Sequence, residues 1–233
     1  NGSKEEDYTS LSGRASVAQE LNNGSTTLTL GANYEYDTID PFHGIPTPLT
    51  AMNGVANNQT ESKKVLSLSG GLTQLLTPNW LVQVNYNYGR ASGYQTDPYK
   101  IVSVVDATTG APEAYLYESR PDTRTRQSVY ATSKFAMGSF VTDVSARYYF
   151  DDWGINSMTF EVAEHVPLGR SAYVEPRVRY YKQDQADFFA YFLPDSAALP
   201  NYVSTDARLD GFTAWTFGAS AGVILSPSME VYG

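Results

Sequence analysis

The sequence predicts an all-β protein: an antiparallel up-and-down transmembrane β-barrel, with about 10 strands in a chain that is a fragment of a larger barrel. Three observations lead to this prediction. Apolar and polar residues alternate along almost the whole chain, which is typical of strands whose two faces meet different surroundings. One face of these strands has no charged residue through its middle, and short and long connections follow one another between the strands.

The composition fits one large all-β domain and excludes several other classes. The chain has 233 residues, 18% of them charged, and a net charge of −9. An acidic chain lacks the basic footprint that nucleic-acid binding requires, and a chain without cysteine has no disulfides or thiolate metal sites. The longest apolar run, 188–193, is far below the roughly 20 residues of a membrane helix. Because the chain starts with neither Met nor a signal segment, we expect it to be processed or cut from something longer.

The alternation divides the chain into strands. In residues 26–37, for example, Leu28 and Leu30 share one face, whereas Thr29 and Glu35 lie on the other. The same pattern predicts about nine full strands and the start of a tenth. They span residues 8–21, 26–37, 64–76, 80–90, 124–137, 140–151, 157–166, 171–183, 208–225 and 229 onward.

Connection lengths favour a barrel over a soluble β-sandwich, whose strands would also alternate. Tight turns follow alternate strands; Asn23-Gly24 suits a type I′ hairpin and Gly138-Ser139 a type II′ hairpin. Three of the other connections are long loops, at about 38–63, 91–123 and 184–207. Short turns at one end and long extracellular loops at the other are the layout of an outer-membrane barrel. An aromatic girdle would lie at the long-loop ends of the strands, formed by Tyr36, Tyr88, Phe150 and Tyr180.

Two of the long loops contain further patterns. Residues 99–118 alternate on both sides of a turn-like segment, which predicts a small hairpin folded outside the barrel. The third loop includes the apolar run 188–193, which would be an unusual patch on an exposed loop. We expect this run to plug the lumen or to pack against neighbouring loops rather than to bind a partner.

Several segments of the chain resemble a family of bacterial outer-membrane barrel proteins that is catalogued only as a domain of unknown function. These segments are Glu118-Ser-Arg-Pro-Asp-Thr-Arg-Thr-Arg, Arg147-Tyr-Tyr-Phe-Asp-Asp-Trp-Gly-Ile, Pro176-Arg-Val-Arg-Tyr-Tyr-Lys-Gln with Ala186-Asp-Phe-Phe, and Ser204-Thr-Asp-Ala-Arg-Leu. The resemblance covers the chain well from about residue 95 onward, and the first 90 residues only in general character. It implies the barrel fold and the bacterial outer membrane, and it supplies no catalytic or binding residues.

The resemblance also implies further strands and partners. Family members are longer, with a signal peptide and more strands ahead of this region. The first predicted strand begins on the long-loop side and the tenth is cut short, so we expect strands on both sides of this chain and a closed barrel of roughly 12 to 16 strands. Members are often encoded near periplasmic redox and flavin-attachment proteins, which suggests surface or periplasmic protein partners of a redox kind.

The inner face of the predicted barrel carries charged residues whose neighbours follow from strand register. The Gly138-Ser139 turn sets three cross-strand pairs: Lys134 with Asp143, Tyr130 with Arg147, and Arg126 with Asp151. Pairing Asp151 with Ser157 extends these rows to Glu161 and His165, and avoiding like charges places Arg177 opposite Glu161. The expected lumen charge network consists of Arg126, Lys134, Asp143, Arg147, Glu161, His165, Arg177 and Arg179.

Within this set we expect two lateral networks, Lys134–Asp143–His165 and Arg147–Glu161–Arg177. One interpretation is a polarised constriction that selects solutes by charge, as rings of charged side chains do in channels. The interpretation that we favour is that these charges neutralise one another and fill the lumen, because opposite signs alternate between neighbours.

No catalytic constellation is recognisable, and we expect no enzyme activity, no cofactor and no metal. His43 and His165 are the only histidines, and they fall at opposite ends of the predicted barrel, so they would not share a metal ion. Asp143 and His165 would be two members of a Ser-His-Asp set, with Ser145 or Ser171 nearby. A hydrogen-bonded histidine in a polar lumen explains the same residues. Acidic loop residues lack the spacing of an EF-hand.

We therefore expect an outer-membrane β-barrel protein, surrounded by outer-membrane lipid, that acts as a channel or as a scaffold in a surface assembly. The alternatives are an outer-membrane hydrolase with a site at the rim and a secreted soluble β-sandwich adhesin.

One local expectation tests the barrel. Pro176 lies in the middle of the eighth predicted strand, so that strand should bulge or lose a rung there, and Arg177 or Arg179 should reach the freed carbonyl.

Overall fold

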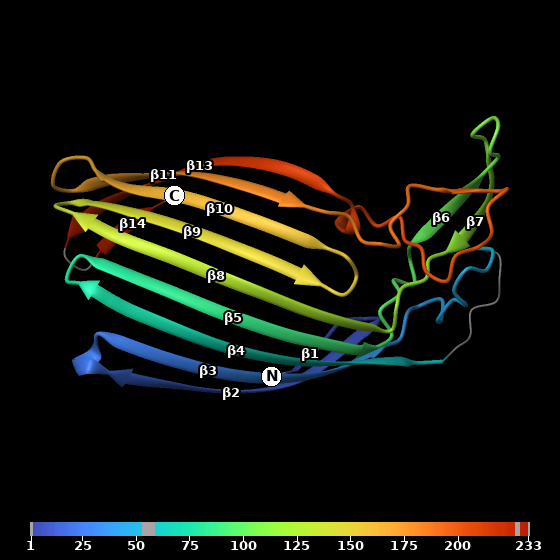
Figure 1. Cartoon of the computed structure of the whole chain (residues 1–233), viewed down its shortest axis with the longest axis horizontal. Coiled ribbons are helices and arrows are strands. Elements are labelled where there is room, and N and C mark those ends of the chain that lie inside the picture. The colour runs from blue at the N-terminus through green and yellow to red at the C-terminus, as the bar shows by residue number, and fades with distance from the viewer. Residues whose placement is uncertain (1, 53–58, 227–228, 233) are drawn as a thin grey trace.

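The computed structural model describes residues 2–52, 59–226 and 229–232. Eleven strands form one antiparallel sheet in the order β1-β2-β3-β4-β5-β8-β9-β10-β11-β13-β14, which we call the wall. Its strands are β1 (Gly2–Lys4), β2 (Tyr8–Leu21), β3 (Thr26–Ile39), β4 (Glu61–Thr77), β5 (Trp80–Gly93), β8 (Thr123–Met137), β9 (Phe140–Asp151), β10 (Asn156–Pro167), β11 (Ala172–Gln183), β13 (Phe212–Ser226) and β14 (Met229–Tyr232). Figure 1 shows the wall curling about the direction of its strands.

The expected strands are all found, each within a few residues of its predicted bounds, and β1 is an additional short strand. The expected hairpin outside the wall is also confirmed. It consists of β6 (Ile101–Val105) and β7 (Pro112–Tyr117), and β12 (Leu193–Pro194) pairs with β6 to complete a three-stranded sheet. No helix in the part of the chain that the structure describes is long and apolar enough to cross a membrane.

Closure into a barrel is not seen in this chain. Among the described residues the edge strands β1 and β14 do not pair with each other, so the wall is an open sheet. Strand β1 pairs only with residues 9–11 of β2, and β14 pairs only with residues 222–226 of β13. Most of the outer edge of β2 and of β13 therefore presents backbone N–H and C=O groups that pair with no described strand.

The two faces of the wall differ as the alternation predicts. The convex face is apolar and exposed: Leu30 is 63% exposed and Phe217 is 73% exposed. The concave face carries Ser, Thr, Asn and charged side chains, and it lines the larger polar cavities. The wall thus has its apolar side outside, the reverse of a soluble protein with a core inside the sheet.

The turns of the wall agree with the predictions in part. Gly138 has φ +63°, the positive value that the first central position of a type II′ turn requires. The expected type I′ turn at Asn23-Gly24 is wrong, because that connection is the 3₁₀ turn η1 (Asn22–Gly24) with three consecutive positive φ angles. The tight turn expected at 226–228 lies partly outside the described residues.

Cross-strand register is as predicted between β8 and β9 and shifted by two residues in the next two hairpins. Lys134 pairs with Asp143, as expected, but Arg147 pairs with Thr159 rather than Glu161. The cause is a shorter turn: the Asp151 carboxylate accepts hydrogen bonds from the backbone N–H groups of Trp153 and Ile155, at 3.0 Å each. This carboxylate closes the chain reversal in fewer residues than the sequence suggested.

In the next hairpin Glu161 pairs with Arg179, and the predicted Arg177 lies opposite Ala163. Strand β11 does lose pairing at Pro176, as expected. The register between β10 and β11 passes from Ala163↔Arg177 directly to Val166↔Val174, whereas the pairing of β11 with β13 is continuous. The missing rungs are on the β10 side because proline has no N–H to donate there. That an arginine reaches the freed carbonyl stays a prediction.

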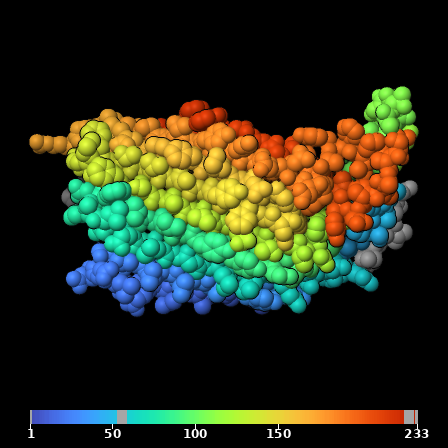
Figure 2. Space-filling view, in the orientation of Figure 1, coloured from blue at the N-terminus to red at the C-terminus, as the bar shows by residue number. Residues whose placement is uncertain are grey.

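The long loops pack together into a cap at one end of the wall, formed by residues 40–52, 94–122 and 184–211. Figure 1 shows β6 and β7 at that end, and Figure 2 shows the segment around residue 200, in orange, covering it. A buried apolar cluster lies where the cap joins the wall: Trp153, Ile155, Ala186, Phe189 and Leu209. Within the run 188–193, Phe188 and Phe189 pack at this cluster as expected, whereas Tyr191 and Phe192 are 70% and 51% exposed.

Candidate functional site

A cavity on the concave face of the wall is built from side chains that share one level of the sheet. Strand register aligns Arg14, Asn33, Ser67, Gly89 and Arg126 in a single lateral row across β2, β3, β4, β5 and β8. This row and its neighbours enclose a volume of about 470 Å³. The strand ladder thus brings together residues as far apart in sequence as Arg14 and Arg126.

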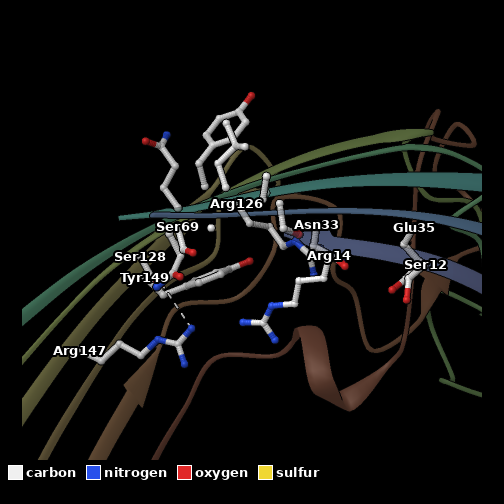
Figure 3. A pocket seen from close by; sticks show the side chains of 17 residues that line it. Ser12, Arg14, Asn33, Glu35, Ser69, Arg126, Ser128, Arg147 and Tyr149 are labelled. Carbon is white, nitrogen blue, oxygen red and sulfur yellow. Dashed lines mark hydrogen bonds between the residues drawn. The ribbon is translucent and has the colours of Figure 1, made fainter. Parts of the chain in front are cut away.

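Three arginines line this cavity. Arg126 lies beside Gly89, which has no side chain. A Cβ atom added to Gly89 would stand 3.7 Å from Arg126 Nε, so the Arg126 guanidinium group extends over Gly89. Arg147 rises from β9, and its Nη2 donates a hydrogen bond to Ser128 Oγ at 3.4 Å. Figure 3 shows the guanidinium groups of Arg14 and Arg147 pointing into the same hollow, with Glu35 apart from them beside Ser12.

None of these three arginines has an ion pair among the described residues. Asp151, which register places opposite Arg126, is held by Arg124 instead, whose Nε lies 2.9 Å from Asp151 Oδ2. The same Asp151 oxygen accepts a hydrogen bond from Tyr149 at 2.7 Å. Glu35 is the only carboxylate that lines the cavity, and it is within 4.0 Å of no described cation. The cavity therefore has an excess of positive charge inside a chain whose net charge is −9.

The predicted lumen networks are correct at one pair and wrong at the others. Lys134 and Asp143 form the expected ion pair, with 3.2 Å between Nζ and Oδ2. His165 does not bond to Asp143: its Nδ1 lies 2.7 Å from Glu175 Oε1. The two-residue shift of β10 separates the members of the second proposed network. Among the described residues no ion pair joins Arg147, Arg177 or Arg179 to an acid, and none joins Glu161 to a basic side chain, so the expected neutralising network is wrong here.

A second polar cluster lies in the cap. The Glu118 side chain is fully buried, and Arg120 pairs with it through Nε at 2.6 Å. Arg120 Nη2 also lies 3.0 Å from Asp206 Oδ2, and Asp206 in turn accepts from Arg208. Ser204 donates its hydroxyl hydrogen to Glu118. Burial alone would raise the pKa of Asp206, but hydrogen bonds from Arg208 and Arg120 hold it well below its usual value.

The arginines of the cap and the wall meet in adjoining cavities of about 410 and 370 Å³ between the two regions. Arg120 and Arg124 line both of them, and Arg179 lines the larger one. Arg124 also lies with its guanidinium carbon 4.2 Å from the centre of the Trp153 ring, a cation–π contact that ties wall to cap.

Sequence reasoning did not anticipate the cap cluster, although the signal was present. The segments beginning at Glu118, Arg147, Ala186 and Ser204, which carry the family resemblance, are the ones that supply the cap cluster and the buried apolar core. Their separation in the chain hides the fact that they meet in space.

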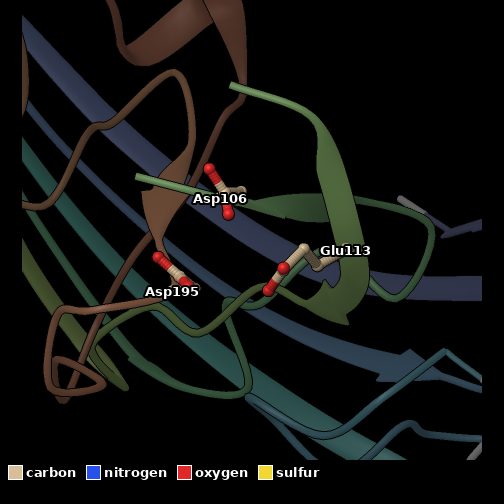
Figure 4. A group of neighbouring side chains, drawn as sticks. All are labelled: Asp106, Glu113 and Asp195. Atoms are coloured by element: carbon tan, nitrogen blue, oxygen red, sulfur yellow. The ribbon is translucent and has the colours of Figure 1, made fainter. Parts of the chain in front are cut away.

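The structure offers weak support for metal or hydrolytic chemistry. Asp106, Glu113 and Asp195 bring one carboxylate oxygen each within 4.8 Å of one another, as Figure 4 shows. These acids are exposed or half-buried, and Asp106 already accepts from the backbone of Thr108 and Thr109 at 2.9 and 2.6 Å. Exposed acids often lie together in this way without an ion. His165 bonds to Glu175, so the incomplete triad with Asp143 is not assembled.

Comparisons with known proteins identify a family and give no activity. The family model described as "Protein of unknown function (DUF3570)" matches residues 1–231. No curated protein matches the chain. A similar solved structure is the ferric-catecholate import receptor Fiu from E. coli K12 in its open form, with 14% identity and a TM-score of 0.47. The alignment covers 97% of this chain and 46% of that receptor, so this chain spans less than half of its length.

Proposed function

The chain belongs to the family described as "Protein of unknown function (DUF3570)" over nearly its whole length, and from this premise we propose that it forms the wall of an outer-membrane β-barrel that acts as a channel for small polar solutes. The family match extends the resemblance to the first 90 residues as well. The proposal includes a bacterial outer-membrane location and contact with outer-membrane lipid.

A single observation carries the proposal: the same strands expose an apolar face on the convex side and a polar face on the concave side. Val17, Leu30 and Trp215 are 61%, 63% and 61% exposed on the convex face. A monomeric soluble protein rarely leaves so large an apolar surface in water. Lipid is the surrounding that suits the convex face, and water is the one that suits the concave face.

The open edges of the wall support closure by further strands. In a bilayer every backbone N–H and C=O must find a partner, which excludes free sheet edges. The outer edges of β2 and β13 are long, and β1 and β14 cover only a few residues of each. Further strands paired along those edges would satisfy the backbone and close the barrel.

Conductance of the full-length protein, folded in detergent and inserted into planar bilayers, tests the proposal. Stepwise currents that are absent in control bilayers are the expected result. Fractionation of outer membranes provides the companion measurement of location. A full-length protein that stays soluble without detergent would contradict the membrane wall altogether and favour a secreted adhesin.

The cap supports a second candidate, a scaffold in a surface assembly. Its folded loops expose Tyr191, Phe192, Leu199 and Tyr202, which are 70%, 51%, 57% and 44% exposed. Aromatic side chains of this kind are common at protein interfaces. A protein that localises to the outer membrane but gives no current would favour the scaffold. Redox-related protein partners belong to this second candidate, and the absence of enzyme activity stays a prediction in both.

A further inference from the structure

We infer that the cavity between Arg14, Arg126 and Arg147 is a binding site for small organic oxyanions that carry two or more carboxylate or phosphate groups. This inference rests on the proposed function, because closure of the barrel would turn the open concave face into a water-filled lumen with the cavity on its wall. It assigns the channel a class of solute.

The first argument is charge. Three guanidinium groups face one cavity, and none of them forms an ion pair with a described residue. Arginine keeps its charge at any physiological pH, so the repulsion among the three cannot be removed by loss of a proton. An oxyanion in the cavity offsets this repulsion, and a planar carboxylate or a phosphate can bind a guanidinium through two parallel hydrogen bonds.

The second argument is that the nearby acids are engaged or set apart. Asp151 is held by Arg124, Tyr149 and two backbone N–H groups. Glu35 lies one row nearer the cap than Arg14, opposite Ser12 rather than beside an arginine. Arg124 therefore pairs with an acid of the fold, whereas Arg126 forms no ion pair with any residue that the structure describes.

The third argument is the neutral lining. The cavity is completed by hydroxyl and amide groups, which are supplied by Ser67, Ser69, Asn87, Ser128 and Tyr149. Hydroxyl and amide groups can donate hydrogen bonds to further oxygens of the same ligand. The cavity contains almost no large aliphatic side chain besides Leu68, so an apolar ligand would find few contacts there.

The fourth argument is size and placement. A volume of about 470 Å³ is within the usual range for small-molecule sites. Arg14 and Arg147 come from β2 and β9, strands well separated across the curve of the wall, and both point into the hollow. A ligand with two or more acidic groups can pair with both guanidinium groups at once, each through its own carboxylate or phosphate.

The experiment uses the full-length protein folded in detergent, with citrate as the carboxylate probe and inorganic phosphate and glucose as comparisons. Isothermal titration calorimetry measures binding, and the reversal potential of bilayer currents in a KCl gradient measures ion selectivity. The test variant is Arg126→Gln/Arg147→Gln. The matched control is Lys64→Gln/Arg90→Gln, which removes two exposed positive charges from the convex side of β4 and β5.

We expect citrate to bind the wild type and the control alike and to lose about tenfold or more in affinity in the test variant. Phosphate should bind more weakly than citrate at one side of the cavity, and glucose should not bind. Anion preference in the bilayer should fall in the test variant only. The charge-conserving Arg126→Lys/Arg147→Lys variant should keep part of the citrate affinity, because charge remains and the paired hydrogen bonds are lost.

Failure of the inference and failure of the proposed function give different results. Currents without anion preference, together with no citrate binding, overturn the oxyanion site and leave the channel standing. Citrate binding that depends on the two arginines in a protein without current supports the site and overturns the channel. Equal loss of citrate binding in the test and control variants would mean that net charge rather than this cavity attracts anions, and would overturn the site.

Discussion

The wall and the cap are held together in different ways. The wall exposes its large apolar residues: Leu11 is 66% exposed and Phe217 is 73% exposed. The cap and its junction with the wall bury apolar side chains as a soluble domain does: Val102 in the cap is fully buried, and Trp153 at the junction is 3% exposed. Most of the buried apolar residues in the described part of the chain belong to the cap or to its junction with the wall.

This difference indicates that different interactions stabilise the two regions. The wall depends on backbone hydrogen bonds along its ladders and on the surroundings of its convex face. The cap depends on its own buried side chains, including the ion pair of Glu118 with Arg120, which is shielded from water. A substitution should therefore act on the wall through the surroundings of its convex face or through register, and on the cap through packing and unpaired charge.

The largest effect is expected for Glu118→Gln in the cap. Glu118 is fully buried and holds Arg120, Ser204 and the backbone N–H of Asp97, the last at 2.8 Å. Breaking a buried pair by removal of one partner costs about 3–5 kcal/mol. Urea unfolding of the cap, followed by Trp fluorescence, measures the loss. The same change at Glu161 on the concave face, where no ion pair is formed among the described residues, should cost within about 0.5 kcal/mol.

A somewhat smaller effect is expected for Val162→Arg in the wall. Val144, Val162 and Val178 form one lateral row on the convex face. An arginine at the bilayer midplane costs about 2–4 kcal/mol. Urea titration of the protein folded in lipid vesicles measures it. Ala163→Arg, one residue along and opposite Asp143, should be much milder; equal damage at both positions would show that the convex face does not contact lipid.

The turns allow a matched comparison of glycines. Gly154 has φ +87° and packs against Asp187, so a Cβ there would overlap the Asp187 carboxylate. Gly138, in a turn of the wall, has φ +63° and open space around it. We expect Gly154→Ala to destabilise by about 2–3 kcal/mol, from strain and overlap together, and Gly138→Ala by about 1 kcal/mol, from strain alone. Thermal unfolding of the two variants separates the contributions, and equal shifts would contradict the close packing at Gly154.

The smallest effect is a dependence of the cap on pH. The pKa of Asp206 is lowered in the folded protein, so its ion pairs contribute stability above the unfolded value of about 3.9 and lose it as the pH falls through the folded value. The protection of cap amides against hydrogen exchange, corrected for the intrinsic pH dependence of exchange, should therefore be unchanged from pH 7 to about pH 4 and fall only below that. The Lys134–Asp143 pair on the wall is more exposed, so the same acid range should change the wall less. Loosening of the cap near neutral pH would rule out this explanation.

Much of the wall could be predicted from the sequence, because a strand is a local object. Alternation in residues such as Leu28, Thr29 and Leu30 identifies a strand and its faces without knowledge of its partners. The Gly138-Ser139 turn also fixes a register, because a two-residue hairpin allows only one pairing. The β8–β9 pairs therefore agree with prediction, and so does the loss of pairing at Pro176.

The candidate site could be predicted only in part. Arg126 and Arg147 were identified as concave-face residues from the alternation, but neither forms an ion pair with the acid expected for it: Asp151 binds Arg124, and the register beyond β9 is shifted. The turn around Trp153 is closed by the Asp151 side chain and by Gly154 in a left-handed conformation, and neither length nor composition revealed this. A register error of two residues leaves each side chain on its predicted face but changes the residue opposite to it. Glu161 therefore does not lie opposite Arg147.

By itself, the sequence determined the strands, the face on which each side chain lies, and the ends at which short turns and long loops occur, because these follow from local periodicity. Only the tertiary structure decided which side chains meet. It brought Glu118, Arg120, Asp206 and Arg208 together in the cap, and it placed Asp151 against Arg124, so that Arg126 has no ion pair within the described part of the chain. Competition between neighbouring charges for one partner is settled by distances of a few ångströms, and such distances depend on register and loop packing that a linear pattern does not contain.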